Sequence, residues 1–262
     1  AGCRSATGCL DWCFRHFLVD GSQDRETYFG AIYSLILPMA SSHPVRKNII
    51  HQDLEEGLWG GDEKTAAMAW AGRTLDELGL LPAPFPIADH FSEQDRERLG
   101  YSEGGGGISY GNFSVRADGD RFWMSASGVD KSHLRVVGRD ILLVKGYDES
   151  QGAMVLSVPP GLEPGRASVD AIEHWMLYRE HPRVGAILHV HAWMDGVTST
   201  DVVFPCGTLE LGLAVVALAR EADDPPRAVV GLKNHGLTIL GESMKEILQR
   251  VAGRLYRPVP MS

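Results

Sequence analysis

The sequence predicts a protein of the α/β class, and three observations support this prediction. Short apolar stretches of strand length recur between residues 110 and 241. Stretches rich in helix-forming residues lie between them, and Gly- or Pro-containing segments separate the two kinds. The composition, 44% hydrophobic and 23% charged, is that of an ordinary globular protein with a core. We therefore expect one large domain, or a medium domain with an appendage, in 262 residues.

Charge and hydropathy exclude several classes of function. A formal net charge of −9 argues against general nucleic-acid binding and against an anionic membrane surface as a partner. No apolar run approaches the ~20 residues that a membrane-spanning helix needs. The four cysteines fit neither a C-x₂-C zinc pattern nor a recognisable disulfide framework. Free thiols and a cytoplasmic location are therefore expected.

The N-terminal third carries no recognisable chemistry. Residues 63–78 are rich in helix formers and predict an amphipathic helix. Residues 28–37 fit a buried helix or a buried strand equally well. A Pro-rich stretch at 81–86 breaks regular structure and is typical of a linker or domain boundary. We therefore expect a partly helical segment of unknown role at 1–85 and a domain at 86–262.

The elements after this boundary alternate in type. Residues 103–116 form a glycine-rich loop whose backbone N–H groups could hold an anion, although such loops are more often flexible turns. Strands are expected at 121–128, 140–147, 155–159, 184–191, 227–232 and 237–241. Helices are expected at 169–180, 208–222 and 243–255. Ser168 is the expected N-cap of the first of these helices and Ser243 that of the last.

Two histidines end the strand at 184–191. His189 and His191 project from the same face, roughly 7 Å apart, because successive side chains of a strand alternate between faces. Two imidazoles in this arrangement can bind one metal ion, although an isolated pair is more often simply solvated. His235 follows a later strand, where a satisfied strand-end histidine is the alternative. Asp170 begins the preceding helix, where the helix dipole alone could explain an acidic residue.

Five motifs in this order resemble those of the class II aldolase/adducin family. They are GNFSVR at 111–116, SASG at 125–128, Asp170 with His174, AILHVH at 186–191 and NHG at 234–236. The resemblance extends from about residue 85 to the C-terminus.

The resemblance implies a three-layer α/β/α domain around a mostly antiparallel sheet at residues 86–262. It implies a homo-oligomer, usually a tetramer with active sites at subunit interfaces. It also implies zinc bound by His189, His191 and His235, with Fe²⁺ or Mn²⁺ as alternative metals. Asp170 stands where the family has its catalytic glutamate. The implied substrate-binding residues, which hold phosphate in the family, are Ser109, Gly111, Asn112, Ser127, Gly128 and Ser168.

Two departures concern the substrate. Val169 replaces a second hydroxyl of the phosphate pocket, and the stretch between Asp195 and Pro205 is shorter than in the sugar-phosphate aldolases of the family. Both departures weaken the expectation of a sugar phosphate more than that of a metal centre.

Three neutral imidazoles leave zinc an open coordination position, as in catalytic sites. Zinc there would stabilise an enediolate as a Lewis acid, and Asp170 would carry a proton. We therefore expect a zinc-dependent aldehyde-lyase that cleaves a small hydroxy-carbonyl compound, sugar-like or sugar-phosphate-like, by a retro-aldol step. A related epimerase, dehydratase or decarboxylase remains an alternative. An iron-dependent oxygenase on the same histidines and a non-catalytic, adducin-like interaction module remain open too.

Overall fold

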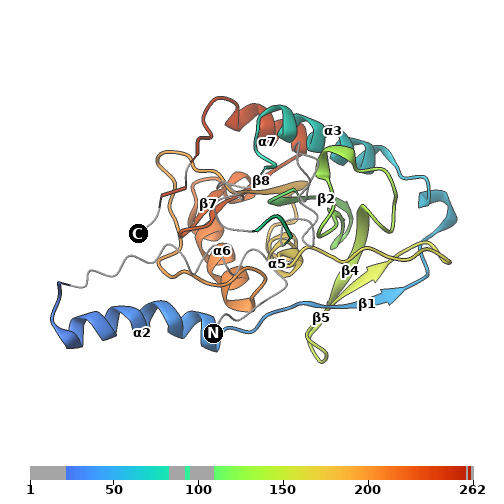
Figure 1. Cartoon of the computed structure of the whole chain (residues 1–262). Coiled ribbons are helices and arrows are strands. Elements are labelled where there is room, and N and C mark those ends of the chain that lie inside the picture. The colour runs from blue at the N-terminus through green and yellow to red at the C-terminus, as the bar shows by residue number, and fades with distance from the viewer. Residues whose placement is uncertain (1–21, 83–91, 95–108, 258, 261–262) are drawn as a thin grey trace.

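One sheet between two layers of helices organises the molecule, as the sequence predicts (Figure 1). The computed structural model describes residues 22–82, 92–94, 109–257 and 259–260. In these residues the sheet has eight strands in the order β1-β5-β4-β3-β2-β6-β8-β7. Its neighbouring strands are antiparallel, except that β1 and β5 run parallel. The strands are β1 (Lys47–His51), β2 (Asn112–Asp118), β3 (Arg121–Ser125), β4 (Ile141–Asp148), β5 (Ala153–Ser157), β6 (Ala186–Val190), β7 (Val229–Leu232) and β8 (Gly236–Gly241).

Helices cover both faces of the sheet. One face packs against α5 (Ala171–Glu180) and α6 (Leu209–Glu221). The opposite face packs against α3 (Glu63–Glu77) and α7 (Met244–Val251). Short 3₁₀ turns occur at Glu56–Leu58 (η1), Lys131–His133 (η3) and Pro225–Arg227 (η4). The α/β class and the layered architecture expected from the sequence are therefore confirmed.

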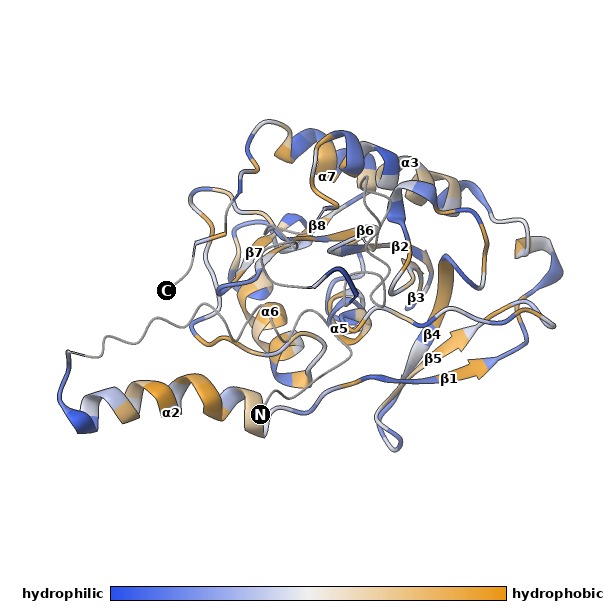
Figure 2. Cartoon of the chain, in the orientation of Figure 1, coloured by the Kyte–Doolittle hydropathy of each residue, from blue (hydrophilic) through white to orange (hydrophobic). Residues whose placement is uncertain are grey.

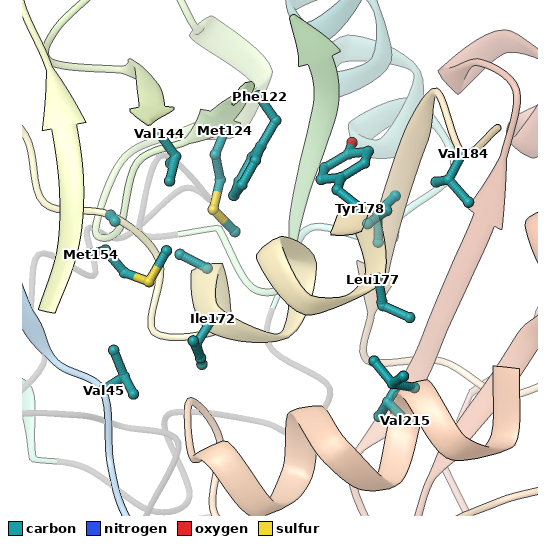
Figure 3. Packing of buried hydrophobic residues seen from close by; sticks show 14 of the residues in the cluster. Val45, Phe122, Met124, Val144, Met154, Ile172, Leu177, Tyr178, Val184 and Val215 are labelled. Atoms are coloured by element: carbon teal, nitrogen blue, oxygen red, sulfur yellow. The ribbon is translucent and has the colours of Figure 1, made fainter. Parts of the chain in front are cut away.

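Two hydrophobic cores follow from the alternation of side chains along each strand. In β4, Leu142 and Val144 face α5 and α6, whereas Ile141 and Leu143 face the other layer. Figure 3 shows the first core, in which Ile172 and Leu177 of α5 pack near Val215 of α6. Because α5 packs against the sheet on one side and against α6 on the other, its first turn has a fixed position over the middle of the sheet.

Two expectations for helix termini have different outcomes. Ser243 caps α7 as predicted, because its side chain accepts a hydrogen bond from the backbone N–H of Glu246. Ser168 is not the N-cap of α5: this position belongs to Asp170, whose side chain makes no capping hydrogen bond. The Asp170 carboxylate is instead engaged by a neighbouring strand, so tertiary contact overrides the local capping preference.

The N-terminal third contributes an edge strand and part of one helical layer to the sheet. Strand β1, which the sequence did not predict, pairs with β5 at the edge of the sheet, and α3 covers the second core. Residues 28–37 belong to helix α2 (Arg25–Ser41), which has no buried residue and extends away from the body (Figures 1 and 2). A boundary at residue 85 stays a proposal, and most of the linker expected at 81–86 lies outside the described residues.

None of the helices in the described residues combines the length and the hydropathy needed to cross a bilayer.

Candidate active site

Three histidine side chains converge at one end of the central strands. His189 lies on β6, His191 directly follows it, and His235 lies in the turn between β7 and β8. The Nε2 atom of His191 is 3.1 Å from Nε2 of His189 and 3.2 Å from Nε2 of His235. Tetrahedral zinc with Zn–N distances of ~2.0–2.1 Å places neighbouring ligand atoms about 3.3 Å apart. The structure thus brings the three predicted ligands together in a geometry that fits one metal ion.

The chain positions this triad through backbone features. Asn234 adopts a left-handed conformation (φ 59°), which turns the chain just before His235. A Cβ atom at Gly236 would lie 2.2 Å from the carbonyl oxygen of Val190, so only glycine allows this turn to approach β6. The Nδ1–H group of His189 donates to the carbonyl oxygen of Leu237 at 3.1 Å, which leaves Nε2 as the ligand atom.

Burial keeps the three imidazoles neutral. Burial lowers the pKa of His189, although the charge of the Asp170 carboxylate acts in the opposite direction. Burial lowers the pKa values of His191 and His235 well below the usual range. Within the described residues, the three side chains form a buried group that could hold a metal ion. Three clustered Nε2 atoms cannot all carry a proton at these distances, so a shared cation fits this donor set better than hydrogen bonds do.

Asp170 lies beside the triad at the N-terminus of α5. Its Oδ2 atom accepts a hydrogen bond of 2.7 Å from the side-chain Nδ2 of Asn112 on β2. Its Oδ1 atom is buried and has no hydrogen-bond partner among the described residues. A buried carboxylate oxygen without a partner is costly, so this atom is available to a group that enters the site.

Glu173, one turn after Asp170, is a second buried carboxyl group that the sequence did not single out. Its Oε1 atom accepts a hydrogen bond of 2.6 Å from Oγ1 of Thr238 on β8. Burial, reinforced by the charge of Asp170, raises the pKa of Glu173 to about 8. From sequence alone, a glutamate in a first helical turn only suggests interaction with the helix dipole, so no signal indicated its burial.

Lys131 in η3 is also buried, and it was also missed. Its ammonium group donates to the carbonyl oxygen of Ser109 at 2.7 Å, and its backbone N–H donates to the Ser109 hydroxyl at 2.8 Å. Burial lowers the pKa of Lys131 to about 8, although Asp170 and Asp130 act in the opposite direction. The site therefore contains a desolvated cation as well as the carboxylate, and an anionic substrate group could pair with it.

His174 belongs to a buried network beneath the site. Its Nδ1 atom lies 2.7 Å from the Ser114 hydroxyl, which is also 2.9 Å from the hydroxyl of Tyr178. Burial lowers the pKa of His174 to about 3. A neutral, fully buried imidazole that supports a strand and a helix is a structural feature rather than an acid–base candidate.

The remaining predicted residues lie on segments that backbone hydrogen bonds connect to one another. The Ser109 N–H group donates to the carbonyl oxygen of Val129, close to the turn with Ser127 and Gly128. The Ser127 N–H group donates to the carbonyl oxygen of Arg166, two residues before Ser168. Whether these residues line one pocket stays a prediction. Residues 103–108 of the expected anion loop lie outside the described part of the chain.

Gly111 has a clear steric role. It adopts φ +68°, and a Cβ atom there would lie 2.4 Å from the carbonyl oxygen of His189. Glycine therefore permits the close approach of β2 that places Asn112 beside β6.

The expectation of free thiols is wrong for Cys206, which is disulfide-bonded. Its sulfur atom lies 3.5 Å from Nε2 of His235. The other cysteines lie outside the described residues.

Sequence comparison identifies relatives for part of the chain. Residues 97–201 match the Class II Aldolase and Adducin N-terminal domain, which confirms the predicted resemblance. A methylthioribulose-1-phosphate dehydratase of Pectobacterium carotovorum is 37% identical over 82 residues, 31% of this chain and 34% of that protein. The enzyme of the same name from Marinobacter nauticus is 28% identical over 138 residues, 53% of this chain and 56% of that protein. The chain thus spans about a third to a half of the length of the curated relatives it matches.

Structural comparison gives weaker similarities. L-Fuculose-1-phosphate aldolase from Thermus thermophilus matches with a TM-score of 0.43 and 23% identity, over 71% of this chain and 85% of that chain. An aldolase II superfamily protein from Pseudomonas syringae matches with a TM-score of 0.48 and 19% identity, over 72% of this chain and 69% of that chain.

Proposed function

Because residues 97–201 carry a class II aldolase and adducin N-terminal domain, we propose that this chain is a metal-dependent lyase acting on a small, phosphorylated hydroxy-carbonyl compound. The observation that carries the proposal is the convergence of three buried histidine Nε2 atoms beside a buried carboxylate. A structural metal site would be expected to have four protein ligands, whereas three leave a position for substrate.

The proposed metal ligands are His189, His191 and His235, and zinc is the proposed ion. When bound, a divalent metal would act as a Lewis acid toward a carbonyl and a neighbouring hydroxyl group. Fe²⁺ and Mn²⁺ remain alternatives, because imidazole also suits these ions.

Asp170 is the proposed acid–base residue. The hydrogen bond from Asn112 holds Oδ2, so the free Oδ1 atom can take a proton from substrate carbon or oxygen without a change of rotamer. Asp170 is buried, and its carboxylate interacts electrostatically with the Lys131 ammonium group.

An anionic group on the substrate has two sources of support. Lys131 provides a buried positive charge that is hydrogen-bonded to Ser109, and the other proposed binding residues, Gly111, Ser127, Gly128 and Ser168, are small. The matched relatives are named for a phosphorylated substrate. We therefore propose that these residues bind the substrate phosphate, whereas Asn112 orients Asp170 through its hydrogen bond.

Two reactions fit this site, and they differ in their products. Dehydration removes a proton from the carbon beside the carbonyl and the hydroxyl from the next carbon, and releases water. Retro-aldol cleavage removes the proton of that hydroxyl, breaks the bond between the two carbons, returns a proton to the carbon beside the carbonyl and releases two carbonyl fragments. The names of the matched relatives favour dehydration, whereas the sequence motifs led us to expect retro-aldol cleavage.

Metal analysis combined with product analysis tests the proposal. Protein purified without added metal should contain about one zinc per chain, and His189→Ala should lose it. The surface variant His133→Gln, whose side chain is 63% exposed, should keep it. Mass spectrometry of products from a panel of ketose 1-phosphates should show either loss of water or two fragments. Full metal content in His189→Ala, or no turnover of the whole panel by zinc-loaded protein, would contradict the proposal.

We extend the proposal to a homo-oligomer, which rests on the family resemblance. Light scattering of the purified chain should give a mass that is a multiple of 28.6 kDa, and a monomer would contradict it.

A further inference from the structure

Glu173 occupies a place that neither the family motifs nor the proposed chemistry explains. Its carboxyl group is almost completely buried, and its Oε2 atom has no hydrogen-bond partner among the described residues. The Thr238 hydroxyl, also fully buried, donates to Oε1. A buried carboxyl with a single partner costs stability, so a compensating role in the site is reasonable.

The sheet register shows what this contact connects. His189 on β6 lies directly opposite Asn112 on β2 and, on its other side, directly opposite Thr238 on β8. Residues directly opposite each other in antiparallel strands project from the same face of the sheet. The three side chains therefore form one row across three strands, with the proposed metal ligand in the middle.

Helix α5 binds both ends of this row. Asp170 at its N-terminus accepts from Asn112, and Glu173 one turn later accepts from Thr238. The two carboxyl groups thus attach the first turn of α5 to the strands on either side of β6. If the Thr238 end were released, the helix would be held at the Asn112 end alone, and the carboxylate of Asp170 could shift relative to His189.

We propose that Glu173 is a positioning residue: through Thr238 it fixes the first turn of α5 and so holds Asp170 beside the metal-binding histidines. This inference rests on the proposed function, in which Asp170 moves the proton. Glu173 acts here as a hydrogen-bond acceptor. Its raised pKa is consistent with a neutral carboxyl, for which glutamine is a close substitute.

The test compares four variants of the metal-loaded protein. Thr238→Val removes only the hydroxyl, Thr238→Ser retains it, Glu173→Ala removes the acceptor and Glu173→Gln retains an acceptor oxygen. A misplacement of about 1 Å can cost about 10²-fold in rate. We expect Thr238→Val and Glu173→Ala to lower kcat by about 10- to 100-fold, with KM and zinc content unchanged. A fifth protein combines Thr238→Val with Glu173→Ala. Its kcat should be no lower than that of either single variant, because both substitutions remove the same contact.

A second measurement does not depend on turnover. The side-chain amide resonance of Asn112, assigned by its absence in Asn112→Asp, reports directly on the contact with Asp170. It should move in Thr238→Val and Glu173→Ala and stay in place in Thr238→Ser and Glu173→Gln. If wild-type protein turns over no substrate, the proposed function fails, while this resonance still decides the positioning role.

Three outcomes would overturn the inference. An unchanged Asn112 resonance in Thr238→Val would show that the hydrogen bond between Thr238 and Glu173 does not hold Asp170 in place. Equal loss of activity in Thr238→Ser and Thr238→Val would show that the hydroxyl is irrelevant. Losses that multiply in the double variant would show that the two residues act separately. Thr238→Val is the decisive variant if Glu173→Ala does not fold.

Discussion

The side chain of Asp170 does not make the hydrogen bond that is usual for its position in the helix. As N-cap of α5 it would normally accept a hydrogen bond from its own helix, yet it makes no such bond. Its carboxylate turns to Asn112 on the neighbouring strand instead. The helix thereby gives up a local stabilising contact of about 1 kcal/mol, which is understandable if the carboxylate is needed beside the histidines.

Replacing Asp170 by Asn should lower kcat by ~10²–10⁴, because general acid–base catalysis typically contributes that much. Zinc content should stay the same, since Asp170 is not one of the three converging ligands. Asp170→Glu, which has the carboxyl group of the related family, should retain measurable activity. Steady-state kinetics with metal analysis on each variant provide the measurement. Full activity of zinc-loaded Asp170→Asn would assign the proton to another group.

The Glu173 carboxyl should make stability depend on pH in a defined direction. Its folded pKa of about 8 lies above the usual value of 4.5. The stability it contributes is therefore fully present below about pH 4.5 and is lost as the pH rises through about 8. Metal-free wild-type protein should lose stability relative to Glu173→Gln between about pH 5 and about pH 8. Urea unfolding of both proteins at these pH values measures the difference, and a constant difference would contradict the shift.

At the scale of elements, the sequence predicted those parts of the site that depend on local pattern. The strand that carries His189 and ends just before His191, the helix that follows Ser168 and the turn at His235 all occur near the expected residues. Residues such as Glu173 and Lys131 could not be found, because their burial depends on which strand or turn packs over them. Strand β1 was missed for a related reason: its short, half-exposed sequence is strand-like only because β5 pairs with it.

Packing between α3 and η3 gives a prediction at this scale. A Cβ atom at Gly72 of α3 would lie 1.9 Å from the carbonyl oxygen of Lys131, so the helix can approach this turn only with glycine. Gly72→Ala should lower the free energy of unfolding by about 1–3 kcal/mol, a typical cost of overpacking, despite the better helix propensity of alanine. KM should rise, because Lys131 moves with the turn.

Gly57→Ala is the matched control, since its Cβ atom would meet open space. Urea midpoints and KM values of the two variants provide the comparison. Wild-type values in Gly72→Ala would show that the two elements separate easily.

For the whole molecule, the N-terminal third is tied to the site by long-range contacts. The backbone N–H of Ala167 donates to Oδ1 of Asn48 on β1 at 3.0 Å. The backbone N–H of Val45 donates to the carbonyl oxygen of Gly207, just before α6. These contacts connect a segment without recognisable chemistry to the residues that precede Asp170 and to those that precede α6, so the fold around the site is not confined to the motif-bearing part of the chain.

The contact of Asn48 with Ala167 provides the test of this connection. Asn48→Ala leaves the largely buried N–H of Ala167 without its acceptor, at a cost of about 1–3 kcal/mol in the free energy of unfolding. Since Ser168 is the next residue, we expect KM for a phosphorylated substrate to rise while kcat changes little. Asn48→Asp, which keeps an acceptor oxygen at the same position, should preserve both the urea midpoint and KM. If Asn48→Ala lowers the midpoint but leaves KM at the wild-type value, β1 supports the fold without influencing the substrate-binding residues.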